Sequence, residues 1–245
     1  MLRKIVLVSL VLLLAAGPAA AGIINGGFET GDWTGWTKNG GSFDGTYHWT
    51  GDPGKSAVVG TGFDYYSNDQ LPQVAYGNYA ARVNNYDYNY HFSTIEQTVS
   101  NWGTGKVFFA WAAVLEEPSN AHPPADAPHF RITLYDVTTS TTLYDVAFNV
   151  YQPPLIPGFQ WKNGRYTGSQ WKYNDWVIQE IAANQGDTLR ITVLASDCGW
   201  GGHGGYAYVD QFSESQIPPP VPVPSAVLLL GSGLAGLAAW RKFKA

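Results

Sequence analysis

The chain has 245 residues, of which 13% are charged and 15% are aromatic, with 28 glycines and 15 prolines. Low charge and abundant aromatic side chains exclude an intrinsically disordered protein and favour an all-β protein with short strands and many turns. Segment 22–217 holds nine of the 14 basic residues and all 19 acidic ones, a formal net charge of −10. It is therefore a poor partner for nucleic acid, whose binding depends on Lys and Arg. The single cysteine, Cys198, excludes an intramolecular disulfide.

The first 21 residues are typical of a secretory signal peptide. Arg3 and Lys4 form a positive start, residues 5–16 are apolar, and three alanines, residues 19–21, supply a cleavage site. We expect the secretion machinery to remove this segment after Ala21. The alternative, a transmembrane anchor, is disfavoured because the apolar run is too short to span a bilayer comfortably.

Residues 22–217 are predicted to form a single jelly-roll-like antiparallel β-sandwich. Residues 107–115 are a continuous apolar run, which suits a strand buried on both faces. Residues 130–137 alternate, with Phe130, Ile132 and Leu134 on one face, and residues 142–150 are the expected partner strand. Two further strands are expected at residues 188–195 and 206–212, the second being the last strand of the body. No amphipathic helix is expected in the body.

Two groups of aromatic residues are candidates for binding sugar rings. In the predicted strand 86–92, Tyr86, Tyr88 and Tyr90 share a face with Phe92, and the polar residues take the other face. This aromatic row can stack on sugars, or it can be core, which the large burial gain of aromatic side chains favours. Around the turns at Gly164 and Gly168, an exposed hairpin is a more natural platform, with three candidate residues: Trp161, Tyr166 and Trp171.

Catalytic chemistry has weaker support in the sequence. Glu116, Glu117 and Asp126 flank a Pro-rich loop, and paired carboxylates could hydrolyse glycosides. Adjacent strand residues point to opposite faces, however, so Glu116 and Glu117 cannot both face one substrate. There is no G-x-S-x-G motif for a serine hydrolase.

The loop at residues 197–206 is rich in glycine and contains Cys198 and His203. A thiol nucleophile would need a third, orienting group, and zinc would need more than these two ligands. A shaped surface loop is therefore the favoured interpretation. Asp197 and His203 remain candidates for a metal or ligand site.

The two ends of the body carry a family resemblance. The sequence INGGFE (residues 24–29), followed by Trp33 and Trp36, and the closing YVDQF (residues 208–212) resemble galactose-binding-like jelly rolls. This resemblance implies that the first and last strands lie together and share a structural calcium. By position, it nominates Glu29 and Asp210, with main-chain oxygen from around Asn25. Oxygen ligands of this kind suit calcium, but Glu29 and Asp210 can equally be ordinary turn acids.

The C-terminal 28 residues contain the sequence GSGLAG (residues 231–236), which matches a dinucleotide-binding pattern. No βαβ unit surrounds it and no acidic residue follows it, so we expect no nucleotide cofactor. The glycines lie instead within an apolar run, residues 226–240, that is followed by basic residues 241, 242 and 244. This run is predicted to be a transmembrane helix with its basic end in the cytoplasm.

The tail as a whole resembles the PEP-CTERM sorting signal of bacterial surface proteins. Its short proline motif consists of Val221, Pro222, Val223 and Pro224, with Val223 where the common form has glutamate. The resemblance implies that an exosortase cleaves near this motif in a Gram-negative bacterium, in a system that accompanies exopolysaccharide production. The protein would be anchored in the membrane before processing and would then lie at the cell surface or in the extracellular matrix.

These observations lead to one main functional hypothesis. We expect a non-catalytic, exported protein that binds polysaccharide. The alternatives are a structural matrix or adhesion protein without a discrete ligand site, and a secreted glycoside hydrolase.

Overall fold

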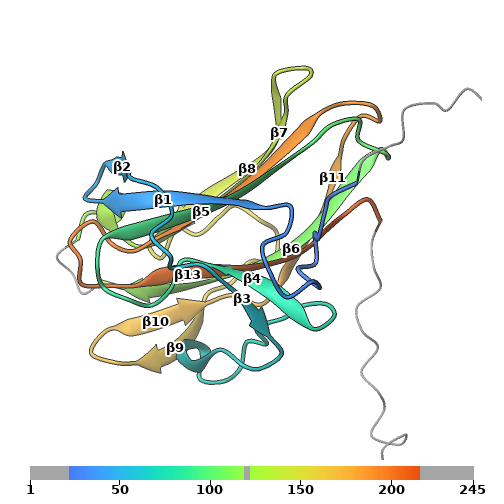
Figure 1. Ribbon diagram of the computed structural model, residues 1–245. Coiled ribbons are helices and arrows are strands. Elements are labelled where there is room, and N and C mark those ends of the chain that lie inside the picture. Colours follow the sequence, from blue (N-terminus) through green and yellow to red (C-terminus); the bar gives the residue numbers. More distant parts are fainter. Residues whose placement is uncertain (1–21, 119–121, 216–245) are drawn as a thin grey trace, which may run out of the picture.

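The computed structural model describes residues 22–118 and 122–215, which form two antiparallel β-sheets packed face to face (Figure 1). Sheet A consists of six strands, in spatial order β2 (Tyr47–Trp49), β1 (Thr37–Phe43), β5 (His91–Val99), β12 (Leu189–Ser196), β7 (His129–Asp136) and β8 (Thr141–Asn149). Sheet B consists of β3 (Ala57–Gly60), β4 (Tyr79–Val83), β13 (Gly205–Ser213), β6 (Lys106–Glu117), β10 (Gln170–Tyr173) and β9 (Lys162–Tyr166), with β11 (Val177–Ala182) also paired to β6. Two short 3₁₀ helices, η1 (Tyr65–Ser67) and η2 (Pro124–Asp126), lie in connecting segments.

The predicted all-β, two-sheet antiparallel architecture is confirmed, and so are five of the six predicted strands. They correspond to β6, β7, β8, β12 and β13, and β7 pairs with β8 as expected. The predicted signal peptide (1–21), the membrane helix (226–240) and the proline motif (221–224) lie outside the described residues. In the described part of the chain, no helix is long and apolar enough to cross a membrane.

The main core lies between the two sheets because the apolar residues of each strand alternate inward. In β7, Phe130 and Ile132 are almost fully buried, and in β6 the indole of Trp111 stacks at 5.1 Å from the Phe130 ring. Burial of side chains of this size stabilises the fold by about 2–3 kcal/mol each, before the entropy cost of ordering them.

A second, smaller core covers the outer face of sheet B. Leu71 and Tyr66, from the segment between β3 and β4, pack there against Trp171, Tyr206 and Tyr208 of the sheet. In this core the buried carboxylate of Asp64 accepts hydrogen bonds from the hydroxyls of Tyr206 and Tyr208, at 2.5 and 2.8 Å. The second core explains why β6 is buried on both faces, as its continuous apolar run predicted.

The predicted strand at residues 86–92 is wrong over most of its length. Residues 84–90 form an irregular loop and β5 begins only at His91, because Asn84 and Tyr90 adopt positive φ angles of 65° and 59°. The side chain of Asn84 anchors this loop by donating hydrogen bonds to Asp197 Oδ1 and to the Gly205 carbonyl, both at 2.9 Å. A strand cannot continue through two left-handed residues.

Candidate functional site

The outer face of sheet A exposes a band of polar and aromatic side chains. Strand alternation turns His129, Arg131, Thr133 and Tyr135 outward from β7, while the residues between them enter the core. Neighbouring strands add further outward side chains: Glu96, Arg190, Thr192 and Asp145. Four of the charged side chains, those of Glu96, Arg131, Asp145 and Arg190, are between 37% and 52% exposed.

Two adjoining hollows run along this band. The first has a volume of about 350 Å³ and is lined by Tyr47, His129, Arg131, Asn149 and Gln152, among others. The second, of about 390 Å³, is lined by Arg131, Tyr135, Asp145, Arg190 and Glu96, among others. Arg131 lines both hollows, and we call the two together the sheet A groove.

Tyr47 enters the groove from the β1–β2 hairpin, and a glycine lets this hairpin close. A Cβ on Gly41 would lie 1.9 Å from the carbonyl oxygen of His48, so only glycine allows β2 to approach β1 here. The hairpin also carries Trp49, which is 56% exposed and packs edge-on against Phe92. Two large aromatic residues therefore stand at this end of the groove.

The electrostatics of the groove are organised by two arginines. Arg131 donates two hydrogen bonds to Asp145, Nε to Oδ1 at 2.9 Å and Nη2 to Oδ2 at 2.7 Å. Arg190 lies 4.0 Å from Glu96 and 5.2 Å from the centre of the Tyr135 ring. Planar guanidinium and carboxylate groups beside aromatic rings can meet both the hydroxyls and the flat apolar face of a sugar.

His129 is held in its neutral form at the first hollow. Its Nδ1 lies 3.1 Å from the carbonyl oxygen of Ala127, to which it donates, so Nε2 accepts from the hydroxyl of Tyr47. Burial lowers the pKa of His129 to about 4 and raises the pKa of Tyr47 to about 12. At neutral pH, the side chains of His129 and Tyr47 therefore line the first hollow as an uncharged, hydrogen-bonded pair.

The sequence interpretation missed every residue of this groove. The signal lay in the polar positions that alternate with Phe130, Ile132 and Leu134, but any half-buried strand shows such positions. Only the order of strands in sheet A brings Arg131, Asp145 and Arg190 together.

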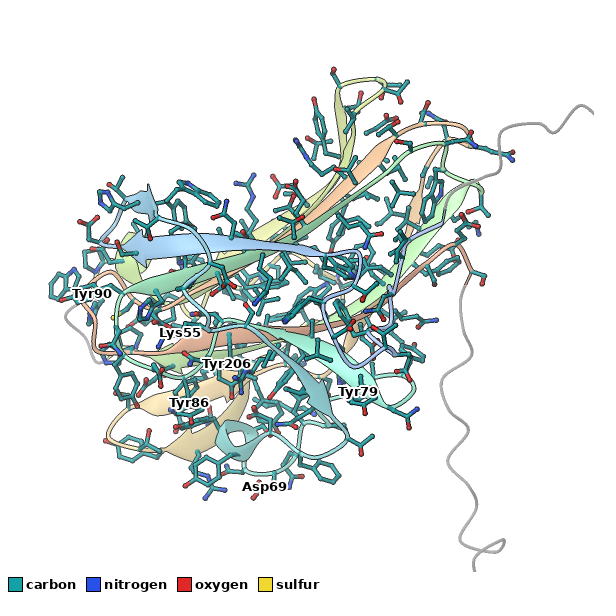
Figure 2. All side chains as sticks on the ribbon, viewed as in Figure 1. Lys55, Asp69, Tyr79, Tyr86, Tyr90 and Tyr206 are labelled. Carbon is teal, nitrogen blue, oxygen red and sulfur yellow. The ribbon has the colours of Figure 1, made fainter. Side chains whose placement is uncertain are left out.

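The predicted tyrosines are exposed, so the interpretation that they are core is wrong. Tyr86, Tyr88 and Tyr90 are 46%, 42% and 43% exposed. Tyr86 and Tyr88 line a third hollow, of about 420 Å³, with Tyr66, Asp87 and Asn89. Tyr90 lies well apart from Tyr86 in Figure 2, so the three do not form one row.

The three aromatic residues predicted near the Gly164 and Gly168 turns differ in exposure. Tyr166 is 70% exposed, as expected of a platform. Trp171 is fully buried beneath Tyr66, 4.1 Å between ring centres, so the expectation that Trp171 is exposed is wrong. Trp161 is half-buried against Phe148 of the main core. The difference arises because strand alternation turns Trp171 toward the second core.

The acidic pair at the end of β6 points to opposite faces, as predicted. Glu117 faces Lys172 at 3.4 Å. Glu116 is 2% exposed, accepts a hydrogen bond from the Gly204 N–H at 3.0 Å, and burial raises its pKa to about 7. Tyr88 and Ser169 also hydrogen-bond to Glu116, so this acid lies beneath the third hollow.

Of the residues nominated for calcium, Glu29 and Asp210 lie near each other. A Cβ on Gly27 would lie 3.7 Å from the Glu29 Cγ methylene and 3.8 Å from Asp210 Oδ1, and the charge of Glu29 acts on Asp210. Glu29 accepts from the Asn78 and Tyr79 N–H groups, and Asp210 from the Ala75 and Tyr76 N–H groups.

Asn25 is engaged elsewhere. Its main-chain oxygen already accepts from the Phe28 N–H and from Trp36 Nε1. Asp210 is fully buried, and burial raises its pKa to about 7. Its carboxylate accepts hydrogen bonds from the N–H groups of Ala75, Tyr76 and Gln211, and among the ion pairs within residues 22–118 and 122–215 none includes Glu29 or Asp210.

The model of the PEP-CTERM protein-sorting motif matches residues 220–242. The chain carries a PEP-CTERM sorting motif. The motif implies an exported protein that an exosortase processes at the cell surface. It covers the tail only, and it includes all four residues of the proline motif. No curated protein matches the chain in sequence.

Comparison with solved structures concerns the sandwich. It is similar to the TmCBM61 module in complex with β-1,4-galactotriose: identity is 15%, the TM-score is 0.40, and the match covers 77% of this chain and 93% of that one. It is also similar to the CBM28 module described as specific for non-crystalline cellulose, with 13% identity, a TM-score of 0.37, and coverage of 79% and 94%. The K2 cleaved adhesin domain of Lys-gingipain matches with 13% identity, a TM-score of 0.35, and coverage of 75% and 89%.

Proposed function

We propose that this protein is a non-catalytic, exported surface protein that binds polysaccharide in the sheet A groove. One observation carries the proposal: two adjoining hollows share Arg131 and follow the outward residues of β7 from His129 to Tyr135. Six residues of extended strand span about 20 Å. A groove of this length can hold several sugar units in a row, with Tyr47 and Tyr135 toward its two ends.

The charged groups of the groove favour binding over hydrolysis. Asp145 accepts two hydrogen bonds from Arg131. Glu96 accepts a hydrogen bond from Thr192 Oγ1 at 2.9 Å and lies 4.0 Å from Arg190. A glycosidase needs one carboxyl group that gives its proton to the leaving oxygen. The two acids whose pKa is raised to about 7, Glu116 and Asp210, are buried on sheet B and lie outside the groove.

The sorting tail supplies the cellular part of the proposal. The membrane helix at 226–240 would hold the protein until an exosortase cleaves near Pro222 and Pro224, in a Gram-negative bacterium. The sandwich would then remain at the cell surface or in the extracellular matrix, where it would meet polysaccharide.

A structural calcium ion is a further component of the proposal. Glu29 and the buried Asp210 would hold it, with oxygen ligands that suit Ca²⁺. The ion would tie residues 24–29 to β13 and to the segment before β4. These segments already meet, since the Phe212 N–H donates to the Gly26 carbonyl at 3.0 Å.

The test is glycan-array binding of the full-length chain in mild detergent, followed by titration of the best glycan against variants. Arg131→Ala and Tyr135→Ala should each weaken binding at least tenfold. Arg165→Ala is the matched control, because Arg165 is a half-buried arginine that lies over Tyr65, outside both hollows of the groove. Loss only in the Tyr86→Ala, Tyr88→Ala double variant would move the site to the third hollow. A blank array with a folded protein would favour the structural or adhesive alternative.

A further inference from the structure

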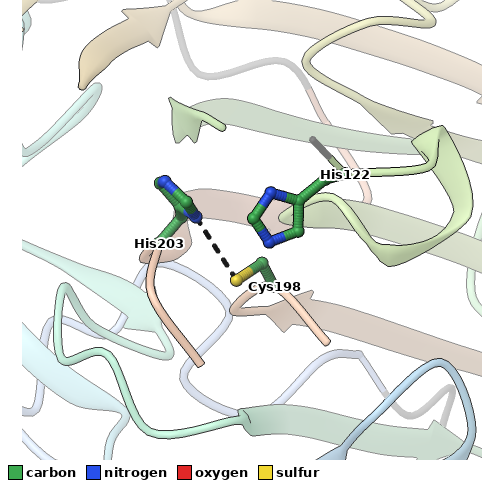
Figure 3. Close-up of side chains that lie close together, drawn as sticks. All are labelled: His122, Cys198 and His203. Carbon is green, nitrogen blue, oxygen red and sulfur yellow. Dashed lines mark hydrogen bonds between the residues drawn. The ribbon is translucent and has the colours of Figure 1, made fainter. Parts of the chain in front are cut away.

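A cluster of metal-ligating side chains lies apart from the sheet A groove. His122, Cys198 and His203 each offer one ligand atom, and these atoms all lie within 4.8 Å of one another (Figure 3). Cys198 and His203 belong to the glycine-rich loop that precedes β13, whereas His122 comes from the loop between β6 and η2. The sequence analysis considered only Cys198 and His203 as zinc ligands, because nothing in the pattern of residues places His122 beside them.

The separations suit coordination of one ion. Cys198 Sγ lies 3.5 Å from His203 Nδ1. A tetrahedral zinc ion, with a Zn–S bond of about 2.3 Å and a Zn–N bond of about 2.05 Å, holds a sulfur and a nitrogen ligand about 3.6 Å apart. The rings of His122 and His203 stand at 90° with their centres 4.8 Å apart. With all three ligand atoms within 4.8 Å of one another, the cluster is compact enough for its members to share one ion.

His122 lacks partners that its environment should supply. Both of its ring nitrogens are buried, and neither has a hydrogen-bond partner among the described residues. The Trp200 ring packs against it, with centres 4.5 Å apart. A buried polar group without a partner costs about 1–3 kcal/mol, and an ion between the three side chains would remove that cost.

The backbone holds the ligand loop in place without a metal. Cys198 N–H donates to the His203 carbonyl at 2.9 Å, and Gly202 N–H donates to Cys198 Sγ at 3.3 Å. The second loop is tied to the first, since Gly199 N–H donates to the Asp126 carbonyl at 2.8 Å and Trp200 Nε1 donates to Asp126 Oδ2 at 3.1 Å. Cys198 itself is fully buried. A preorganised site of this kind loses little entropy on binding.

We propose that His122, Cys198 and His203 form a site for a borderline-soft divalent transition metal, with Zn²⁺ as its probe. One thiolate and two imidazoles select such an ion over Ca²⁺ and Mg²⁺, which prefer oxygen ligands. Three protein ligands leave a fourth tetrahedral position for water or an exogenous group. On binding, the Cys198 thiol releases its proton to solvent. The site is independent of the proposed polysaccharide groove.

The experiment is titration of the full-length chain in mild detergent with Zn²⁺, and with Co²⁺ as an optical probe of thiolate ligation. We expect one equivalent of either metal to bind and Co²⁺ to show a sulfur-to-metal charge-transfer band. His122→Ala should weaken Zn²⁺ binding by at least tenfold, and Cys198→Ser should also remove the band. His48→Ala is the control, because His48 is an exposed histidine outside the cluster, and it should bind like the wild type.

Two results would overturn the proposal. The first is equal Zn²⁺ affinity of the wild type and His122→Ala, which would show that His122 is not a ligand. The second is displacement of Co²⁺ by equimolar Ca²⁺.

X-ray absorption of the zinc-loaded wild type gives an independent test that needs no folded variant. One sulfur at about 2.3 Å and two nitrogens at about 2.0–2.1 Å are expected. A zinc shell without sulfur would contradict the assignment.

Discussion

Arg131 of β7 and Asp145 of β8 are diagonal neighbours across the strand pair and share two parallel hydrogen bonds of 2.9 and 2.7 Å. Both side chains are exposed, so the pair contributes only about 0–1 kcal/mol to the free energy of unfolding. Its effect is on orientation, because the two hydrogen bonds to Asp145 fix the guanidinium of the residue that lines both hollows of the sheet A groove.

The first prediction follows from this difference between stability and orientation. Asp145→Asn should change the free energy of unfolding by less than about 1 kcal/mol. It should weaken polysaccharide binding by about three- to tenfold, the equivalent of about one lost hydrogen bond. Chemical denaturation and titration of the same glycan measure the two effects. A large loss of stability without a loss of affinity would show that the pair is structural.

The second prediction concerns the two aromatic residues of the β9–β10 hairpin. Trp171→Ala should lower the free energy of unfolding by about 3–5 kcal/mol, because the indole is fully buried in the second core. Tyr166→Ala should change it by less than about 0.5 kcal/mol, because that ring is 70% exposed. Urea denaturation of both variants provides the comparison, and similar midpoints for the two would contradict the second core.

The difference between these two residues shows what the sequence could predict and what it could not. Strand periodicity located β6, β7, β8, β12 and β13 because each buries at least one regular face. Periodicity does not tell whether the other face meets water or a second layer, and so the fully buried Trp171 was expected to be exposed. The groove and the metal cluster depend on contacts between distant strands and loops, which local pattern does not encode.

The third prediction is a pH dependence that arises from Glu116. Burial raises its pKa from the ordinary value of 4.5 to about 7, so the folded state favours the protonated acid. The unfolded chain ionises first as pH rises above 4.5, so the contribution of Glu116 to stability should fall between pH 4.5 and pH 7 and level off above that range. Glu116→Gln mimics the neutral acid and should lack this contribution, while Asp210 and His129 titrate alike in both proteins and cancel in the comparison.

Denaturation of wild type and Glu116→Gln at pH 4.5 and pH 8 measures this effect. The stability difference between them should shift by at most about 3 kcal/mol in favour of the variant at pH 8. Glu117→Gln is the matched control, because Glu117 is only half-buried and pairs with Lys172, whereas Glu116 is almost fully buried. A wild-type advantage that grows with pH would give the opposite sign and contradict the burial effect.

The fourth prediction is that calcium stabilises the sandwich through Glu29 and Asp210. Calcium at about 100 times its dissociation constant adds about 2.7 kcal/mol to the free energy of unfolding. For a domain of this size that is a rise in melting temperature of about 5–10 °C over the same protein in chelator. Asp210→Asn should lose most of this rise, and Glu117→Gln should keep it. Equal melting temperatures with calcium and with chelator would show that calcium does not stabilise the sandwich.

The fifth prediction tests the tail as a sorting signal in the native host. Deletion of residues 218–245 removes the matched motif, the predicted membrane helix and the basic end, but leaves every described strand intact. The truncated protein should appear directly in the medium, because nothing would retain it in the membrane for exosortase cleavage. The full-length protein should pass through a membrane-bound precursor that is larger than the mature form. Pulse–chase labelling with fractionation separates these two routes. Identical fractionation of the two proteins would mean that the tail does not direct sorting, and the surface location would then need another cause.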